Sequence, residues 1–139
     1  MRTMSQAPGN VAERRTSPTL VMIGMTLVLL LAQFLLGMYV NLFVPTPDGQ
    51  PVLVAHMVLG TLLLVVALIT TIVATAGRRP GAAVLSAAGL VFLVVAWIGG
   101  VRFLGAGGHD GDSYLMATGF VLAASSYVVA LDRTRRNGA

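Results

Sequence analysis

The sequence predicts an all-α membrane protein, folded as an antiparallel, up-down-up-down bundle of four transmembrane helices. Three observations support this fold class. The 139 residues are 56% hydrophobic and only 10% charged, which is outside the range of soluble globular domains. Four apolar runs are long enough to cross a hydrocarbon core, which takes roughly 20 helical residues. The links between them are short and rich in glycine and proline, so consecutive helices are expected to be antiparallel neighbours.

The chain is expected to form one transmembrane domain, over residues 19–132, with polar ends. The predicted spans are residues 20–44, 52–76, 82–104 and 113–131. The links read PTPDGQP, GRRPG and GAGGHDGD, and the last ends with Asp112 or Ser113 as a natural N-cap of the fourth helix. Residues 1–18 are polar and are expected to be disordered, and residues 133–139 form a basic tail.

The arginines predict the topology. All nine basic residues are arginines, and eight flank apolar runs: Arg2, Arg14, Arg15, Arg78, Arg79, Arg133, Arg135 and Arg136. This placement is typical of membrane topology and not of a nucleic-acid interface, so no nucleic-acid partner is expected. The N-terminal segment, the second link and the C-terminal tail share one side, which the positive-inside rule makes cytoplasmic. We therefore expect a multi-pass protein of the cytoplasmic membrane with both termini inside.

Several kinds of chemistry are excluded by composition. The chain has no cysteine, so disulfides, thiolate metal sites and iron–sulfur clusters are ruled out. The spans contain no acid pair, no nucleophile beside a base and no mid-bilayer Asp, Glu or Lys, which argues against an enzyme, a proton pump or an ion-coupled transporter. His109, Asp110 and Asp112 could gather a divalent ion, but their spacing matches no ligand motif, and no metal site is predicted. A non-catalytic role is favoured.

Small and polar residues collect where membrane helices meet, and each span carries a stripe of them at helical spacing. The four stripes are Thr26, Gln33, Gly37 and Asn41; His56, Gly60, Leu63, Ala67, Thr71 and Ala74; Gly89, Phe92, Ala96 and Gly99; and Met116, Gly119, Ala123, Ser126 and Ala130. We expect these stripes to line the bundle interior. At 1.5 Å per residue, His56, Met116 and Tyr39 then share a layer about 5–10 Å below the outer surface.

His56 has two interpretations, because an imidazole in an apolar helix needs a partner or a ligand. In the first it is a polar packing residue, hydrogen-bonded to Asn41, Tyr39 or water, with Gln33 among the polar residues of the interior. In the second it is an axial ligand of heme b. With Gly60 one turn later, it resembles the H-x-x-x-G helix beginnings of membrane-embedded b-type cytochromes, in which the glycine leaves room for the porphyrin.

A heme would need a second axial ligand and partners for its propionates. The candidates for the ligand are His109, in the third link, and Met116, since histidine with methionine is a known heme pair. Arg102 is one turn from the outer end of its span. It is expected to extend to the surface, or to pair with Asp48, Asp110 or a heme propionate.

The segments NLFV, AHMVLG, GGVRFLG and SYLMATGF, between Asn41 and Phe120, resemble a group of uncharacterised small four-helix membrane proteins from actinobacteria. The features in common are Asn41, His56, Ser113 and Met116. That group distantly resembles one four-helix half of heme A synthase, in which histidines near the outer ends of the second and fourth helices bind heme. His56 matches the first of these, but the fourth helix here has no histidine. The first helix lacks the Glu and His-Arg elements of the catalytic site, so the resemblance does not extend to heme A synthase activity.

Three functions remain open from the sequence. The chain is a non-catalytic accessory or binding module with a polar site near the extracytoplasmic face, a b-type heme-binding or electron-transfer protein with His56 as ligand, or a small transporter or channel subunit. Its expected partners are the lipid bilayer and either a larger membrane complex or further copies of the chain. The first function is favoured because His56 has no obvious second ligand.

Overall fold

The computed structural model describes residues 17–43, 51–105 and 110–136, and these form four helices. Their bounds are α1 Pro18–Phe43, α2 Pro51–Ala76, α3 Pro80–Gly105 and α4 Asp110–Arg136. All four are long and apolar enough to cross a membrane. The expected all-α, four-helix membrane fold is confirmed, and the chain is a multi-pass membrane protein. Of residues 1–18, which were expected to be disordered, 1–16 lie outside the described residues, and Pro18 is the first residue of α1.

Helix starts follow from local sequence. Three helices begin with a proline, whose ring presets φ and lacks the N–H that would be unpaired in a first turn: Pro18, Pro51 and Pro80. The fourth has Asp110 and Asp112 in its first turn and three arginines in its last turn. Charges of these signs at these ends interact favourably with the helix dipole. The first three predicted spans match the helices to within two residues, but α4 starts before the expected cap at Asp112 or Ser113 and extends into the expected basic tail.

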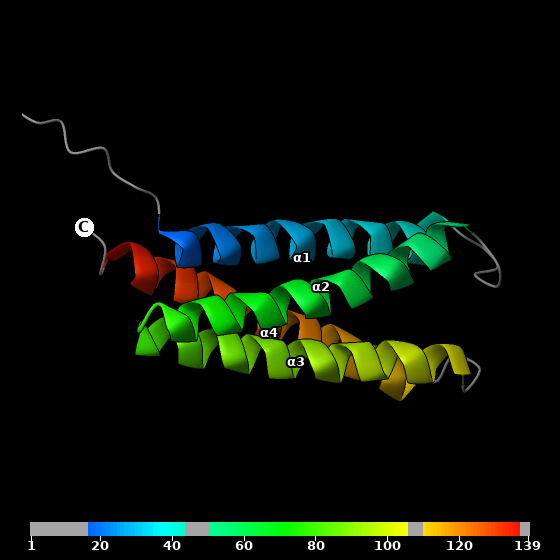
Figure 1. Cartoon of the computed structure of the whole chain (residues 1–139). Helices are drawn as coiled ribbons and strands as arrows, with labels where there is room; N and C mark the ends of the chain where they lie inside the picture. The colour runs from blue at the N-terminus through cyan, green and yellow to red at the C-terminus, as the bar shows by residue number, and fades with distance from the viewer. Residues whose placement is uncertain (1–16, 44–50, 106–109, 137–139) are drawn as a thin grey trace, which may run out of the picture.

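The helices form a ring in which each packs on two neighbours. Consecutive helices are antiparallel and side by side, and α1 closes the ring on α4 (Figure 1). The α3–α4 interface is the most extensive of the four. We call the end where α1 begins, α2 passes into α3 and α4 ends the proximal end, and the opposite end the distal end. The arginine distribution predicts that the distal end is extracytoplasmic.

Burial differs between the two halves of the bundle. In α3 and α4, buried residues recur along the whole helix, whereas in α1 and α2 they lie in the proximal half, up to Leu30 and from Leu63 onward. Residues 31–43 and 51–62 include no fully buried residue. In Figure 1, α2 runs obliquely from beside α3 at its proximal end toward α1 at its distal end. The distal halves of α1 and α2 therefore depend mainly on each other.

The expected interior stripes are confirmed in part. The buried members are Leu63, Ala67 and Ala74 in α2, Gly89, Ala96 and Gly99 in α3, and Gly119, Ala123 and Ala130 in α4. Thr71, Phe92 and Ser126 are half-buried, and Asn41 is exposed. Each four-residue step turns about 40° past a full turn, so the stripe in α1 drifts off the interface by Asn41. Buried residues outside the expected stripes include Thr70, whose hydroxyl lies 2.8 Å from that of Thr26, and Tyr127, whose hydroxyl donates to the Ser86 carbonyl oxygen at 3.2 Å.

Candidate functional site

A glutamine and a histidine meet across the α1–α2 interface in its distal half. Gln33 Nε2 lies 3.2 Å from His56 Nε2 and 3.1 Å from the backbone carbonyl oxygen of His56. A primary amide has two N–H donors and its nitrogen cannot accept, so both hydrogens are used on these two acceptors. His56 Nε2 is therefore the unprotonated ring nitrogen, and the proton of the neutral imidazole is on Nδ1.

Each of these two side chains lies against a glycine of the opposite helix. A Cβ added at Gly37 would stand 2.9 Å from His56 Cε1, and one added at Gly60 would stand 3.0 Å from Gln33 Nε2. Each glycine follows its polar residue by one turn, and the helices are antiparallel, so the arrangement is reciprocal. We call these four residues, Gln33, Gly37, His56 and Gly60, the polar clasp. Its glycines make the room that two polar side chains need within a close helix contact.

Two polar atoms of the clasp have no partner among the described residues. His56 Nδ1 and Gln33 Oε1 are both buried without a hydrogen bond to the protein. Nδ1 carries the ring proton and is a donor, while Oε1 is an acceptor. Leaving such a group unpaired in an apolar surrounding costs about 1–3 kcal/mol. The clasp therefore contains one unpaired donor and one unpaired acceptor, both shielded from the surface.

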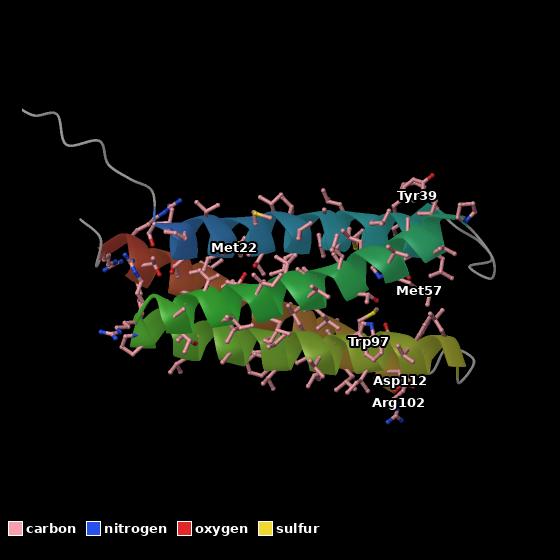
Figure 2. All side chains as sticks on the ribbon, viewed as in Figure 1. Met22, Tyr39, Met57, Trp97, Arg102 and Asp112 are labelled. Carbon is pink, nitrogen blue, oxygen red and sulfur yellow. The ribbon has the colours of Figure 1, made fainter. Side chains whose placement is uncertain are left out.

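Gln33 takes the place for which Asn41 or Tyr39 was expected. Asn41 is exposed, and the Tyr39 ring lies beside that of Phe43, with centroids 5.4 Å apart. Figure 2 shows Tyr39 pointing away from the bundle. Tyr39 follows Gly37 by two residues, about 200° around the helix, and so belongs to the opposite face of α1. His56 thus has Gln33 as its hydrogen-bond partner, in place of the two residues expected.

The sequence contains a signal for this pairing. Gln33 and Gly37 form a Q-x-x-x-G pattern in α1, and His56 and Gly60 form H-x-x-x-G in α2. In an antiparallel pair, two such patterns bring each polar side chain to the other helix's glycine when the registers match. The register comes from packing along the whole interface, including the Thr26–Thr70 contact, and it is not encoded in either pattern alone.

Met116 belongs to a different interface of the bundle. Its backbone nitrogen would be 2.8 Å from a Cβ at Gly99, and its sulfur would be 3.5 Å from a Cβ at Gly100. The side chain thus packs on the paired glycines of α3. These contacts make Met116 a packing residue between α3 and α4, while His56 is bound by α1.

Arg102 forms an ion pair that the sequence did not predict. Its Nε lies 3.0 Å from Asp112 Oδ1, and the two side chains are 67% and 10% exposed. Figure 2 shows the two together on the side of α3 that faces away from α2. Of the expected partners, Asp110 is not the one bound, and Asp48 lies outside the described residues. Asp112 was interpreted only as a cap or an ion ligand, because the sequence alone does not indicate that Arg102 and Asp112 lie close together.

The residues present do not fit a heme as an axial ligand set. His56 Nε2 already accepts a hydrogen bond from Gln33, and the space beside Gly60, which a porphyrin would need, is filled by the Gln33 amide. Met116 packs on α3, and Arg102 is paired with Asp112. The remaining expected ligand, His109, lies outside the described residues. Ligation would therefore require the polar clasp to come apart.

The described residues contain no group of three or more His, Asp, Glu or Cys side chains that could hold a metal ion. Among the described residues of the distal half, the polar clasp and the Arg102–Asp112 pair are the polar side-chain contacts that join two helices. Comparisons of the chain with protein families, with curated proteins and with solved structures find no match.

Proposed function

We propose that this protein is a non-catalytic accessory module of a membrane, and that the polar clasp is the centre of its binding surface. The observation that supports the proposal is the pair of unpartnered buried atoms, His56 Nδ1 and Gln33 Oε1. They lie in the half of the bundle where α1 and α2 have no fully buried residue. A polar centre inside an extended apolar surface is how transmembrane helices commonly recognise one another.

The chemistry of the clasp indicates what it would bind. It holds an unpaired N–H donor and an unpaired carbonyl acceptor, neither of which carries a charge, and because both are buried a partner side chain has to insert beside them. A neutral side chain that both donates and accepts, such as the hydroxyl of serine or threonine or the amide of asparagine or glutamine, matches this pair. The partner we propose is therefore a transmembrane helix of another membrane protein that carries one such residue at the depth of the clasp.

Site-specific photo-cross-linking in native membranes tests this function. A photoreactive residue replaces Met57, which follows His56 directly on α2 and is 46% exposed, or Val128, on α4 and 54% exposed. We expect a discrete protein adduct from position 57 and only lipid adducts from position 128. In a Gln33→Leu background, the adduct at 57 is expected to fall severalfold. An adduct that persists unchanged in this background, or equal adducts at both positions, contradicts the proposal.

The heme-binding alternative is tested on the same purified protein. Heme is added in detergent, and a reduced-minus-oxidised visible spectrum is recorded. Because His56 Nε2 is engaged by Gln33, we expect no Soret band from bound heme. A band that appears in the native chain and is lost in His56→Ala would show that the clasp opens for heme, and would replace the accessory function with a cytochrome-like one.

A further inference from the structure

Arginines from two distant parts of the chain gather at the proximal end. Arg78 and Arg79 lie where α2 passes into α3, and the last turn of α4 contains Arg133, Arg135 and Arg136. Arg79 Nη1 donates a hydrogen bond, at 3.5 Å, to the carbonyl oxygen of Thr134. This contact holds the two groups together although 55 residues separate its partners. We call these five residues the proximal arginine cluster.

The positive charge of the cluster is neutralised only in small part by nearby acidic residues. Asp132 is the one acidic residue described at this end, and it pairs with Arg136, at 2.9 Å from Nε to Oδ2. The remaining four arginines have no acidic partner among the described residues. All but Arg79 are exposed, and in Figure 2 side-chain nitrogens gather where the end of α4 lies beside the start of α3. The proximal end is therefore a strongly positive surface.

Arg78 occupies a backbone conformation that favours glycine. Its φ is 53°, at the end of α2, where Arg78 N–H donates to the Thr75 carbonyl at 3.0 Å and Arg79 N–H donates to that of Ala74 at 3.3 Å. These two bonds define a Schellman motif with Arg78 at the left-handed position, which is usually glycine. An arginine there is strained, because its Cβ crowds the backbone. Such strain persists where the side chain has a use.

We propose that the proximal arginine cluster binds the phosphate of an anionic phospholipid headgroup. The cluster lies at the ends of membrane-spanning helices, where a headgroup phosphate is found, and polybasic segments next to such helices attract anionic lipid. Guanidinium groups bind phosphate oxygens in a bidentate geometry that lysine cannot form. The site is at the opposite end of the bundle from the polar clasp, so this proposal is independent of the proposed function.

Native mass spectrometry of the full chain in detergent, with equal amounts of phosphatidylglycerol and phosphatidylcholine, tests the proposal. We expect phosphatidylglycerol to be retained preferentially. The triple variant Arg78→Gln, Arg133→Gln, Arg135→Gln is expected to bind it about fivefold more weakly for each arginine removed. The corresponding triple lysine variant keeps the charge and is expected to retain most of the preference, with some loss from the missing bidentate geometry. Arg102→Gln, at the distal end, serves as the control and is expected to leave it unchanged.

A single variant separates binding from folding. Arg78→Gly removes one charge and relieves the left-handed strain, so we expect a more stable protein that binds phosphatidylglycerol about fivefold more weakly. Equal retention of both lipids, or unchanged preference in the triple glutamine variant, overturns the proposal. Displacement of the lipid by an equal concentration of inorganic phosphate also overturns it, because the cluster would then be a site for free anions.

Discussion

Gln33 donates both hydrogens of its amide to His56, one to the ring Nε2 and one to the backbone carbonyl oxygen. One side chain of α1 thereby fixes the tautomer of the imidazole and the position of α2 at that depth. An imidazole in an apolar span is costly without such a partner. The reciprocal glycines, Gly37 and Gly60, allow the two helices to approach closely enough for these bonds to form.

The first prediction concerns the glycines of the clasp. In Gly37→Ala the new Cβ meets His56 Cε1 at 2.9 Å, and in Gly60→Ala it meets Gln33 Nε2 at 3.0 Å. The polar side chains must move, so we expect each variant to lose about 1–3 kcal/mol of unfolding free energy. The measurement is unfolding in mixed micelles, followed by circular dichroism.

Gly24→Ala, in the same helix, is the matched control. A Cβ at Gly24 meets nothing within 4 Å, so the higher helix propensity of alanine is expected to raise the unfolding free energy, by up to about 1 kcal/mol. If Gly37→Ala behaves like Gly24→Ala, the close approach of His56 to α1 is wrong.

The second prediction is an energetic coupling between Gln33 and His56. A double-mutant cycle with Gln33→Leu and His56→Leu isolates the interaction from the separate effects of each change. Hydrogen bonds between membrane helices contribute about 0.6–1.7 kcal/mol in such cycles, and we expect a value in this range. A second cycle with Asn41→Leu and His56→Leu is expected to give no coupling, since Asn41 is exposed. A larger coupling in the second cycle would restore the partner first expected from the sequence.

The fold could be predicted from the sequence because length, hydropathy and link composition all indicate the same topology. The ends of α4 could not be predicted in this way. Hydropathy reports where a chain can cross a membrane, whereas the helix continues through Asp110 and Arg136, whose charges suit its dipole. A span prediction is therefore shorter than the helix wherever polar residues are compatible with helical structure.

The candidate site could be predicted in part. His56 and Gln33 were each assigned to the interior from helical spacing, but their contact depends on the register of α1 against α2, which spacing within one helix does not determine. Tyr127 illustrates a related limit. Its ring is fully buried because Gly89 leaves space for it: a Cβ added at Gly89 would stand 2.6 Å from Tyr127 Cε2. Such a fit between helices is invisible in either helix alone.

The third prediction concerns the glycines between α3 and α4. A Cβ at Gly119 would stand 2.7 Å from the Phe92 carbonyl oxygen, and one at Gly99 would stand 2.8 Å from the Met116 backbone nitrogen. Backbone atoms cannot turn aside as side chains can, so the helices must separate. We expect Gly119→Ala and Gly99→Ala to lose about 3 kcal/mol or more, exceeding the loss in Gly37→Ala. The unfolding measurement that served the clasp variants applies here.

Gly111→Ala is the control for this interface. It lies in α4, and its Cβ meets nothing within 4 Å, so we expect no loss of stability. An equal loss in Gly111→Ala and Gly119→Ala would mean that the effect arises from helix α4 itself and not from its contact with α3.

The fourth prediction concerns the ion pair of Arg102 and Asp112. The Asp112 side chain is 10% exposed, but that of Arg102 is 67% exposed, so solvent screens the pair and a coupling of about 1 kcal/mol is expected. A cycle with Arg102→Gln and Asp112→Asn measures it. The coupling is expected to decrease when salt is raised to 0.5 M, since salt screens partly exposed charges, whereas that of the uncharged Gln33–His56 pair is expected to stay constant.

The exposed pair Arg136–Asp132, one turn apart on α4, is the comparison. It is expected to couple by no more than about 0.5 kcal/mol, because both of its side chains remain in solvent. If the two ion pairs couple equally, the burial of Asp112 adds nothing to the link between α3 and α4.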